Sequence, residues 1–172
     1  MGTEGTPYSF VTVWYVEAPI DAVWEAIYEV EAYPRWWKAV LSVEEVEPGG
    51  ADGIGKVDRF VWKAPLGYRL RFSLRVDTVE RPRRLGGAAT GELEGTGYWT
   101  LREEDSVTRV QYDWRVRTNR AFMNLLAPIA RPVFRSSHNA VMSNGATGLA
   151  NLLRGRVFDG DAAYAARARS GS

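Results

Sequence analysis

The sequence contains no cysteine, only three lysines and a single histidine, His138. Without cysteine, the chain can form neither a disulfide nor a thiolate metal site. One histidine supplies too few nitrogen ligands for zinc, and no tight group of acidic residues compensates for this. We therefore expect no metal.

Sequence signatures of nucleotide binding and of hydrolases are also missing. Residues 50–56 have the spacing of a phosphate-binding loop, but Val57 replaces the serine or threonine that would hold magnesium. A strand is expected after this loop, where a phosphate site needs the start of a helix. No G-x-S-x-G motif occurs, and one histidine without a spaced serine and acid is no catalytic triad. We expect a plain turn at residues 50–56 and no cofactor.

The chain lacks any apolar run long enough to cross a bilayer, and residues 1–6 lack the basic and apolar regions of a signal peptide. These absences predict a cytoplasmic protein with no integral membrane segment. The net charge is +1, and no basic block resembles a nucleic-acid-binding arm. Arginine makes up 19 of the basic residues, because only three of the 22 are lysine. A surface of ion pairs accounts for these arginines better than an anion site does.

The first third of the chain predicts one strand and two short helices. Aromatic and β-branched residues fill residues 8–16, which is typical of a strand. Pro19 suits the first turn of a helix, and the helix buries a stripe of apolar residues at helical spacing. These are Ile20, Val23, Trp24, Ile27 and Val30. A second, short helix is expected from Pro34.

Strands dominate the middle of the chain, and a long helix follows them. The expected strands span residues 40–46, 57–62, 68–76, 84–90, 93–102 and 108–117. Polar and apolar residues alternate in the third and the last of these, as in an antiparallel sheet with one buried face. Residues from about 120 to 154 are expected to be helical. This order predicts an α+β domain over residues 8–154, in which a curved antiparallel sheet of about seven strands grips the C-terminal helix. Residues 155–172 are expected to be a tail without function.

At 100° per residue, the long helix presents one arc to the sheet. Its members are Phe134, His138, Val141, Met142, Gly145, Gly148, Leu149 and Leu152. Glycine in a helix costs about 1 kcal/mol relative to alanine, so the two glycines mark either close packing or space left for a ligand. His138 has three interpretations: a satisfied core residue, a polar contact for a ligand, or a general base.

Three segments carry a resemblance to a known family. They are Glu-Ala-Pro-Ile-Asp-Ala-Val-Trp at 17–24, Tyr-Pro-Arg-Trp-Trp at 33–37, and Leu-Leu-Ala-Pro at 125–128 continuing through His138 and Met142 to Gly148 and Leu149. With this element order, the chain resembles the START-like (SRPBCC) superfamily, and within it the polyketide cyclase/dehydrase and lipid-transport group. The resemblance covers about residues 8–154 and implies a helix-grip fold. Its members bind hormones, lipids or quinones, cyclise polyketides or regulate chaperones, so the fold does not select an activity.

We predict a ligand-binding pocket between the sheet and the long helix. Its expected lining is Trp14, Arg59, Tyr68, Phe72, Trp99, Tyr112, Trp114, Asn119, Phe134, His138, Met142, Gly145 and Leu149. Arg59, Asn119 and His138 are the candidate polar contacts, and the aromatic residues would otherwise only build the core.

Three functional hypotheses remain at this point. The preferred one is binding or transport of a hydrophobic small molecule, such as a lipid, an isoprenoid or a polyketide-like compound. The second is an aromatase/cyclase or dehydratase-type enzyme, in which the pocket restricts a reactive chain and His138 or Tyr112 moves a proton. The third is an interaction protein whose interior is closed. No oligomeric state is predicted.

Overall fold

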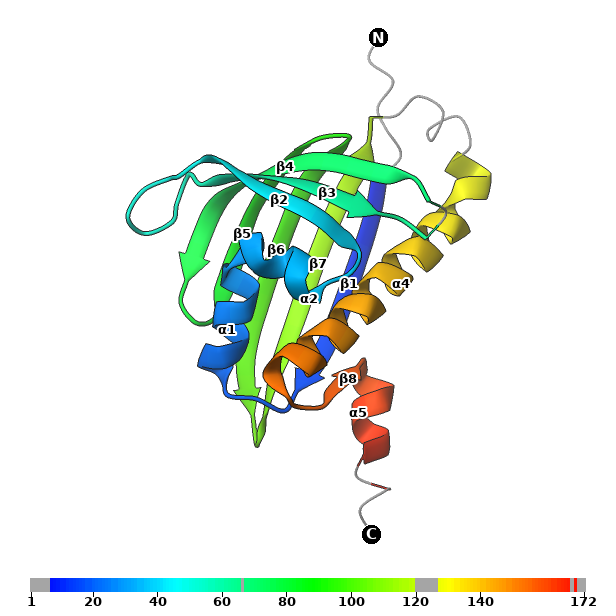
Figure 1. The fold of residues 1–172 in the computed structure, drawn as a ribbon. Helices are drawn as coiled ribbons and strands as arrows, with labels where there is room; N and C mark the ends of the chain where they lie inside the picture. The colour runs from blue at the N-terminus through cyan, green and yellow to red at the C-terminus, as the bar shows by residue number, and fades with distance from the viewer. Residues whose placement is uncertain (1–6, 66, 120–126, 168, 170–172) are drawn as a thin grey trace.

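Alternating apolar residues fold most of the chain into one continuous antiparallel sheet (Figure 1). The computed structural model describes residues 7–65, 67–119, 127–167 and 169, and for residues 127–130 the backbone only. The elements in chain order are β1 (Pro7–Val16), α1 (Ile20–Tyr28), the 3-10 turn η1 (Val30–Ala32), α2 (Tyr33–Trp36), β2 (Val40–Glu47), β3 (Val57–Lys63), β4 (Arg69–Glu80), β5 (Arg84–Gly91), β6 (Leu93–Glu104), β7 (Val107–Thr118), α4 (Ala127–Leu153), β8 (Val157–Asp159) and α5 (Asp161–Arg167).

The sheet has eight strands in the order β2-β3-β4-β5-β6-β7-β1-β8. Strands β2 to β7 form a meander, in which each strand pairs antiparallel with the next, and β1 returns to pair with β7. Register shifts interrupt β2–β3 and β4–β5, and such irregularities bend a sheet. The predicted α+β class with a curved sheet and a long C-terminal helix is confirmed, with one strand more than expected.

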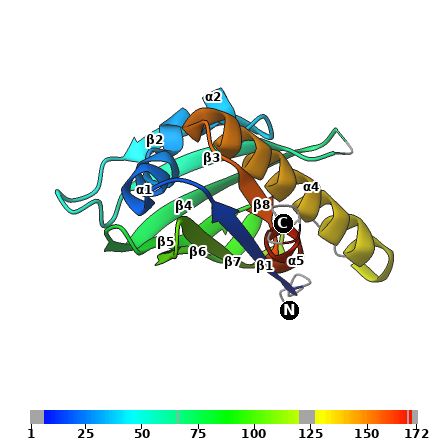
Figure 2. The ribbon, with the colours of Figure 1, turned by 90° about the horizontal axis from the view of Figure 1, so that it is seen from below.

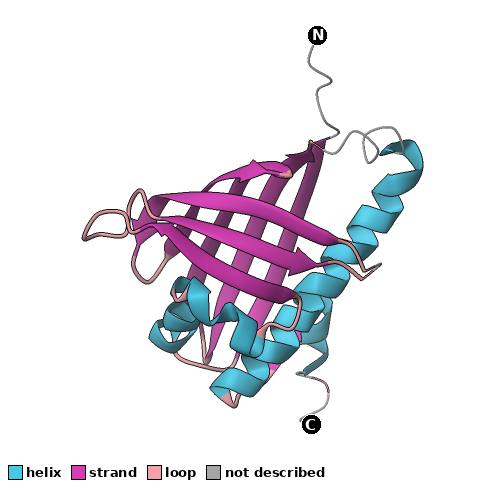
Figure 3. Ribbon diagram, turned by 45° about the horizontal axis from the view of Figure 1, so that its top comes forward, coloured by secondary structure: helices cyan, strands magenta, loops and turns pink. Residues whose placement is uncertain are grey.

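The long helix α4 lies across the hollow of the curved sheet, and α1 and α2 close the hollow beside its C-terminal half (Figure 2, Figure 3). Two hydrogen bonds connect α4 to the α2–β2 region. The indole nitrogen of Trp37 donates to the carbonyl oxygen of Val141 at 2.9 Å, and the backbone nitrogen of Ala39 donates to Oδ1 of Asn144 at 3.0 Å. Among the described residues, no helix is long and apolar enough to cross a membrane.

Gly145 and Gly148 let α2 pack directly against α4. A Cβ atom on Gly148 would lie 1.9 Å from the carbonyl oxygen of Trp36, and one on Gly145 would lie 2.5 Å from Cε2 of Trp37. Neither distance is possible for a real side chain. Close packing is therefore the correct interpretation of the two glycines, and no ligand space opens against Gly145.

The buried arc of α4 follows the helical spacing except at its end. Met142 and Leu149 are buried, whereas Leu152 is 47% exposed. The neighbouring Leu153 packs against the core in its place, so the expected inward position of Leu152 is wrong. The helix ends at Leu153, and its last turn is positioned by the chain that follows.

The first part of the expected C-terminal tail joins the fold. Strand β8 pairs with the end of β1, so that Tyr15 lies opposite Phe158. The ring of Tyr164 in α5 stacks on Tyr15 with centroids 4.0 Å apart, and the Tyr15 hydroxyl donates to Asp161 at 2.8 Å. These contacts could not be predicted from the sequence, because α5 has no buried residue and its composition therefore shows no apolar face.

Candidate functional site

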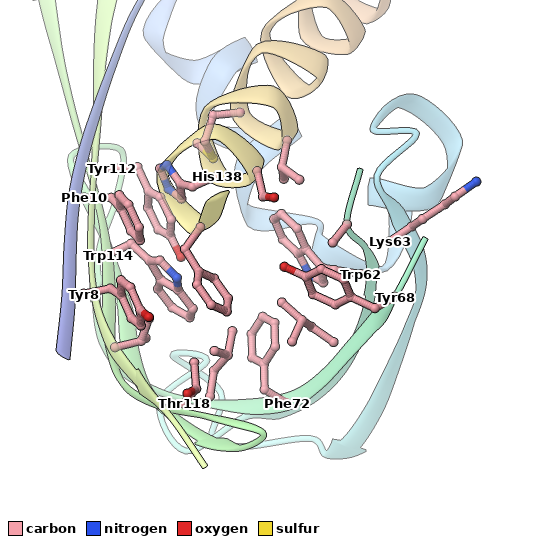
Figure 4. A pocket seen from close by; sticks show the side chains of 18 residues that line it. Tyr8, Phe10, Trp62, Lys63, Tyr68, Phe72, Tyr112, Trp114, Thr118 and His138 are labelled. Atoms are coloured by element: carbon pink, nitrogen blue, oxygen red, sulfur yellow. The ribbon is translucent and has the colours of Figure 1, made fainter. Parts of the chain in front are cut away.

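A cavity of about 90 Å³ lies between the hollow of the sheet and the N-terminal half of α4 (Figure 4). Rings from β1 and β7 face rings from the β3–β4 hairpin across it, and His138 approaches from α4. The lining consists of Tyr8, Phe10, Trp62, Lys63, Ala64, Tyr68, Leu70, Phe72, Leu93, Tyr112, Trp114, Val116, Thr118, Phe134, Ser137, His138, Val141 and Met142. Lys63 is the only charged residue among them, and its side chain extends away from the cavity.

Strand alternation turns the aromatic rings of β7 into the cavity. Tyr112 and Trp114 share the inward phase of this strand, and their rings stack with centroids 5.7 Å apart. The neighbouring strand β6 has Gly97 opposite Trp114. A Cβ atom at Gly97 would lie 2.7 Å from both the Trp114 ring and the Tyr112 hydroxyl. The missing side chain therefore makes room for these two rings to lie over β6.

His138 reaches the cavity as a neutral ring. It stacks on Phe10 with centroids 4.1 Å apart and an interplanar angle of 9°. Burial lowers the pKa of His138 to about 4, because a charged ring loses hydration inside the protein. Neither ring nitrogen forms a hydrogen bond of good geometry with a described residue, and the adjacent Asn139 side chain only partly opposes the fall in the pKa of His138. A neutral imidazole offers one donor and one acceptor, so His138 can bind a hydroxyl or a carbonyl group.

Two further polar atoms of lining residues are buried without a partner in the described part of the chain. They are the hydroxyl of Tyr8 and the indole nitrogen of Trp62. Each such group costs about 1–3 kcal/mol if nothing satisfies it, and native structures contain few of them. Together with His138, they give an otherwise apolar cavity a small number of polar contacts, which is the usual composition of a small-molecule site.

Among its described residues, the cavity lining offers no matched pair of acid and base. None of its lining residues is an aspartate or glutamate, so His138 has no carboxylate to orient it there. A pKa of about 4 makes its ring a weak base at neutral pH. Burial raises the pKa of Tyr112, which keeps that hydroxyl protonated. The arrangement is suited to hydrogen bonding more than to proton transfer.

The structure separates the predicted site residues into two groups. Those that line the cavity are Tyr68, Phe72, Tyr112, Trp114, Phe134, His138 and Met142. Trp14 and Leu149 lie deep in the core, Gly145 lies against Trp37, and Trp99 lines a second cavity.

Arg59 and Asn119 do not reach the cavity. Asp58 and Phe60 take the buried phase of β3, so Arg59 points outward and its guanidinium donates to Glu44 at 3.1 Å. Asn119 is exposed just beyond β7, where its amide donates to the carbonyl oxygen of Gly91 at 3.0 Å. Apolar residues on both faces of β3 left its phase undetermined from the sequence, which explains the error at Arg59.

Sequence reasoning missed several lining residues, among them Tyr8, Phe10, Trp62 and Ser137. Tyr8 and Phe10 share the strand phase of Trp14, so that spacing could have identified them. No local pattern marks Ser137, whose burial depends on how α4 is rotated against the sheet.

A second cavity, of about 70 Å³, lies behind the first. Trp62, Phe72 and Tyr112 line both cavities and form the wall between them. The second cavity is lined on its far side by Lys56 and the buried carboxyl of Asp58.

Three acids meet beside this second cavity, although they are well separated in the sequence. Glu31, Glu45 and Asp58 have oxygens within 4.8 Å of one another. The ammonium of Lys56 pairs with all three, at 3.5 Å from Glu45 and 3.2 Å from Asp58. Burial raises the pKa of Asp58, and the Lys56 charge opposes that rise. The lysine ammonium thus occupies the position that a metal ion would need.

Comparison with known proteins places this site in a family context. The family model described as polyketide cyclase / dehydrase and lipid transport matches residues 16–143. The aromatase/cyclase Zhui from Streptomyces sp. R1128 is 17% identical over 87% of this chain and 94% of that chain, with a TM-score of 0.69. A START superfamily protein from Mycobacterium smegmatis is 15% identical over 87% of this chain and 98% of that chain, with a TM-score of 0.67.

A third similar structure is the di-domain ARO/CYC BexL from the BE-7585A biosynthetic pathway. It is 21% identical over 83% of this chain with a TM-score of 0.63, and the chain spans about half of it, 48%. At these identities, the likeness shows the fold alone. Comparison with curated protein sequences finds no match. Because the family model covers most of the chain, including α1, the whole meander and the cavity-lining part of α4, the protein belongs to the polyketide cyclase/dehydrase and lipid transport family.

Proposed function

We propose that the protein binds a hydrophobic small molecule, such as a lipid, an isoprenoid or a polyketide-like compound, and holds or carries it unchanged. One observation carries this proposal: an interior cavity between sheet and helix is lined by apolar and aromatic side chains, and none of the described lining residues is acidic. Burial of apolar ligand surface against such a lining is favourable by about 25 cal/mol per Å². The family to which the chain belongs supports the same function.

Three polar groups would orient this ligand. His138, the Tyr8 hydroxyl and the Trp62 indole nitrogen are buried in the cavity lining without a partner among the described residues. A ligand oxygen that accepts from Trp62 or exchanges a hydrogen bond with His138 would satisfy them. The ligand is therefore expected to carry at least one carbonyl or hydroxyl group on an apolar skeleton.

The ligand would also have to widen the site. The cavity of about 90 Å³ is smaller than the ~300–1,000 Å³ of most small-molecule sites. The second cavity adds about 70 Å³ behind Trp62, Phe72 and Tyr112. We propose that rotation of these rings joins the two cavities when a ligand enters.

An aromatase/cyclase activity is the second candidate function. The family and the likeness to an aromatase/cyclase support it, and Tyr112 holds a protonated hydroxyl at the wall of the cavity. We favour binding because His138 is a weak base without a carboxylate partner in the lining. Catalysis would be indicated by turnover of a linear poly-β-ketone that the H138F and Y112F variants both lose.

The binding proposal is tested by filling the cavity with a tryptophan. Val141 lines the cavity, whereas Asn151 is exposed near the end of the same helix. The V141W variant should weaken binding of the neutral dye Nile red at least about tenfold, because each displaced methylene of ligand loses about 0.8 kcal/mol. The matched N151W variant should bind the dye as the wild type does. Dye fluorescence titration and circular dichroism provide the measurements.

Equal dye affinity of V141W and the wild type, with both folded, would show that ligands do not enter this cavity. Native mass spectrometry of the protein purified from its own host should, in addition, find a retained hydrophobic molecule in the wild type and not in V141W.

A further inference from the structure

Positive charge collects in a surface groove next to the cavity. An open groove of about 740 Å³ runs beside the N-terminal end of β1, the last residues of β7 and the first turns of α4. Tyr8 and Phe10 line both this groove and the 90 Å³ cavity. These two side chains therefore lie between the groove and the apolar site, and α4 contributes Arg131 and Arg135 to the lining of the groove.

These two arginines have no acidic partner in the described part of the chain. They lie one turn apart on α4, and both are exposed. Like charges at this spacing repel each other. Glu94, the only acid among the described residues of the groove, already pairs with Arg117 at 3.2 Å. Within the described part of the chain, no acid therefore compensates the charges of Arg131 and Arg135.

The direction of α4 increases this effect. Arg131 lies in the second turn of a helix that starts at Ala127, and the first turn contains no acid. The N-terminal end of a helix carries partial positive charge, which favours anions and disfavours cations. The dipole acts mainly within the first turn, so Arg131 and Arg135 themselves supply most of the attraction for an anion here.

Tyr8 adds a hydrogen-bond donor at the junction of groove and cavity. Its side chain is 8% exposed, and its hydroxyl is buried without a hydrogen-bond partner among the described residues. Burial raises the pKa of Tyr8, and the nearby charge of Arg131 opposes that rise. The hydroxyl therefore stays protonated at neutral pH. The charge of Arg131 acts on it electrostatically.

We propose that the natural ligand is an amphiphile with an anionic head group, a carboxylate or a phosphate. Arg131 and Arg135 bind the head group, Tyr8 donates a hydrogen bond to it, and the apolar tail enters the cavity. This inference rests on the proposed binding function and adds the chemical class of the ligand. It also identifies one end of α4 as the side from which the ligand enters.

Three probes with the same tail and different head groups test this inference. Decanoate, decyl phosphate and 1-decanol are compared as competitors of Nile red on the full chain at neutral pH. The two anions should bind about tenfold more tightly than the alcohol, which is typical of charge-assisted hydrogen bonds at a partly exposed site. The R131Q/R135Q double variant should lose this preference and still bind 1-decanol as the wild type does. The R35Q variant, which removes an exposed arginine of α2, should keep the preference.

Two further measurements separate a head-group site from a general effect of charge. The Y8F variant should weaken both anions more than it weakens 1-decanol, because only the anions accept a charge-assisted hydrogen bond from the Tyr8 hydroxyl. An increase of the salt concentration from about 50 mM to about 500 mM should weaken the anions alone, since screening acts on exposed charges. The anion that loses more affinity in the double variant identifies the natural head group as carboxylate or phosphate.

The outcomes distinguish this inference from the proposed function. If Nile red binds but the alcohol competes as well as the anions, the cavity binds apolar ligands and the head-group site is wrong. The same holds if the R131Q/R135Q variant keeps the wild-type preference for anions. If Nile red does not bind at all, the proposed function itself fails.

Discussion

At the scale of single residues, His138 is the clearest case of a polar side chain in an apolar environment. It is held in an apolar cavity with both ring nitrogens unpartnered among the described residues. Its stacking on Phe10 would be equally possible for an apolar ring. The polar atoms therefore cost stability in the empty protein and become useful only when a ligand satisfies them.

The H138F variant should be at least as stable as the wild type at neutral pH and should lose the part of the acid sensitivity that His138 causes. Burial lowers the pKa of His138 to about 4, against about 6.5 in the unfolded chain. Between these pH values the unfolded state binds more protons, so the unfolding free energy of the wild type falls as the pH decreases. The loss due to His138 is about 3 kcal/mol at most. Urea unfolding at several pH values from 7.5 to below 4, compared between wild type and variant, measures it.

A histidine on the surface serves as the control. The N139H substitution, made in the H138F background, adds a histidine at an exposed position of α4. This double variant should have the same pH profile as H138F. Parallel pH profiles for the wild type and H138F would contradict the buried, neutral state of His138.

At the scale of elements, the junction between α2 and α4 decides where the cavity is and where it is not. Gly148 and Gly145 bring α2 into direct contact with the C-terminal half of α4. Among the described elements, no helix packs beside the N-terminal half of the same helix, which forms the roof of the cavity (Figure 2). The division of α4 into a packed half and a half that covers the ligand site follows from this contact.

The G148A variant should destabilise the protein, although alanine favours a helix. Its Cβ atom would lie 1.9 Å from the Trp36 carbonyl oxygen, so α2 and α4 must separate. Overpacking of this kind costs about 1–3 kcal/mol and outweighs the gain of about 1 kcal/mol in helix propensity. Thermal and urea unfolding measure the difference. The S136A substitution at an exposed position of α4 is the matched control and should change stability little.

Lys56 holds η1 to strands β2 and β3, and its charge can be tested by a double-mutant cycle. The K56M variant should lose about 3–5 kcal/mol of stability, because Asp58 is 2% exposed and would be left without its counter-ion. The K56M/D58N double variant should recover much of this loss, since the buried charge is then removed as well. If the double variant is no more stable than K56M, Asp58 is not the group that needs the lysine.

At the scale of the whole molecule, the C-terminal segment closes the sheet. Strand β8 covers the end of β1, the Tyr15–Tyr164 stack joins α5 to the sheet, and Arg156 forms two hydrogen bonds of 2.8 Å with Glu17. Deletion of residues 155–172 should therefore lower the unfolding free energy by about 2–4 kcal/mol, from aromatic stacking and lost strand hydrogen bonds. The Y164A variant should account for about 1 kcal/mol of it. Wild-type stability of the truncated chain would show that residues 155–172 do not contribute to the stability of the fold.

Element identities were accessible from the sequence because they depend on local periodicity. Alternation in residues 68–76 and 108–117 predicted two strands that the structure contains as parts of β4 and β7. The seven main strands, the two short helices and the inward arc of α4 follow the same logic. The resemblance to the START-like superfamily added the way in which these elements are assembled, and the family match confirms it.

The tertiary structure alone decided which side chains form the site. The register shift between β2 and β3 and the outward phase of Arg59 removed a predicted polar contact. The contact of Trp36 with Gly148 restricted the cavity to the other half of α4. Tyr8 and Arg131 line one groove, and Lys56 pairs with Asp58 and Glu31. In both cases, segments that are distant in the chain come together. Such positions depend on the curvature of the sheet and the rotation of α4, and both result from many small contacts throughout the core. The periods of strands and helices, in contrast, are properties of a few neighbouring residues.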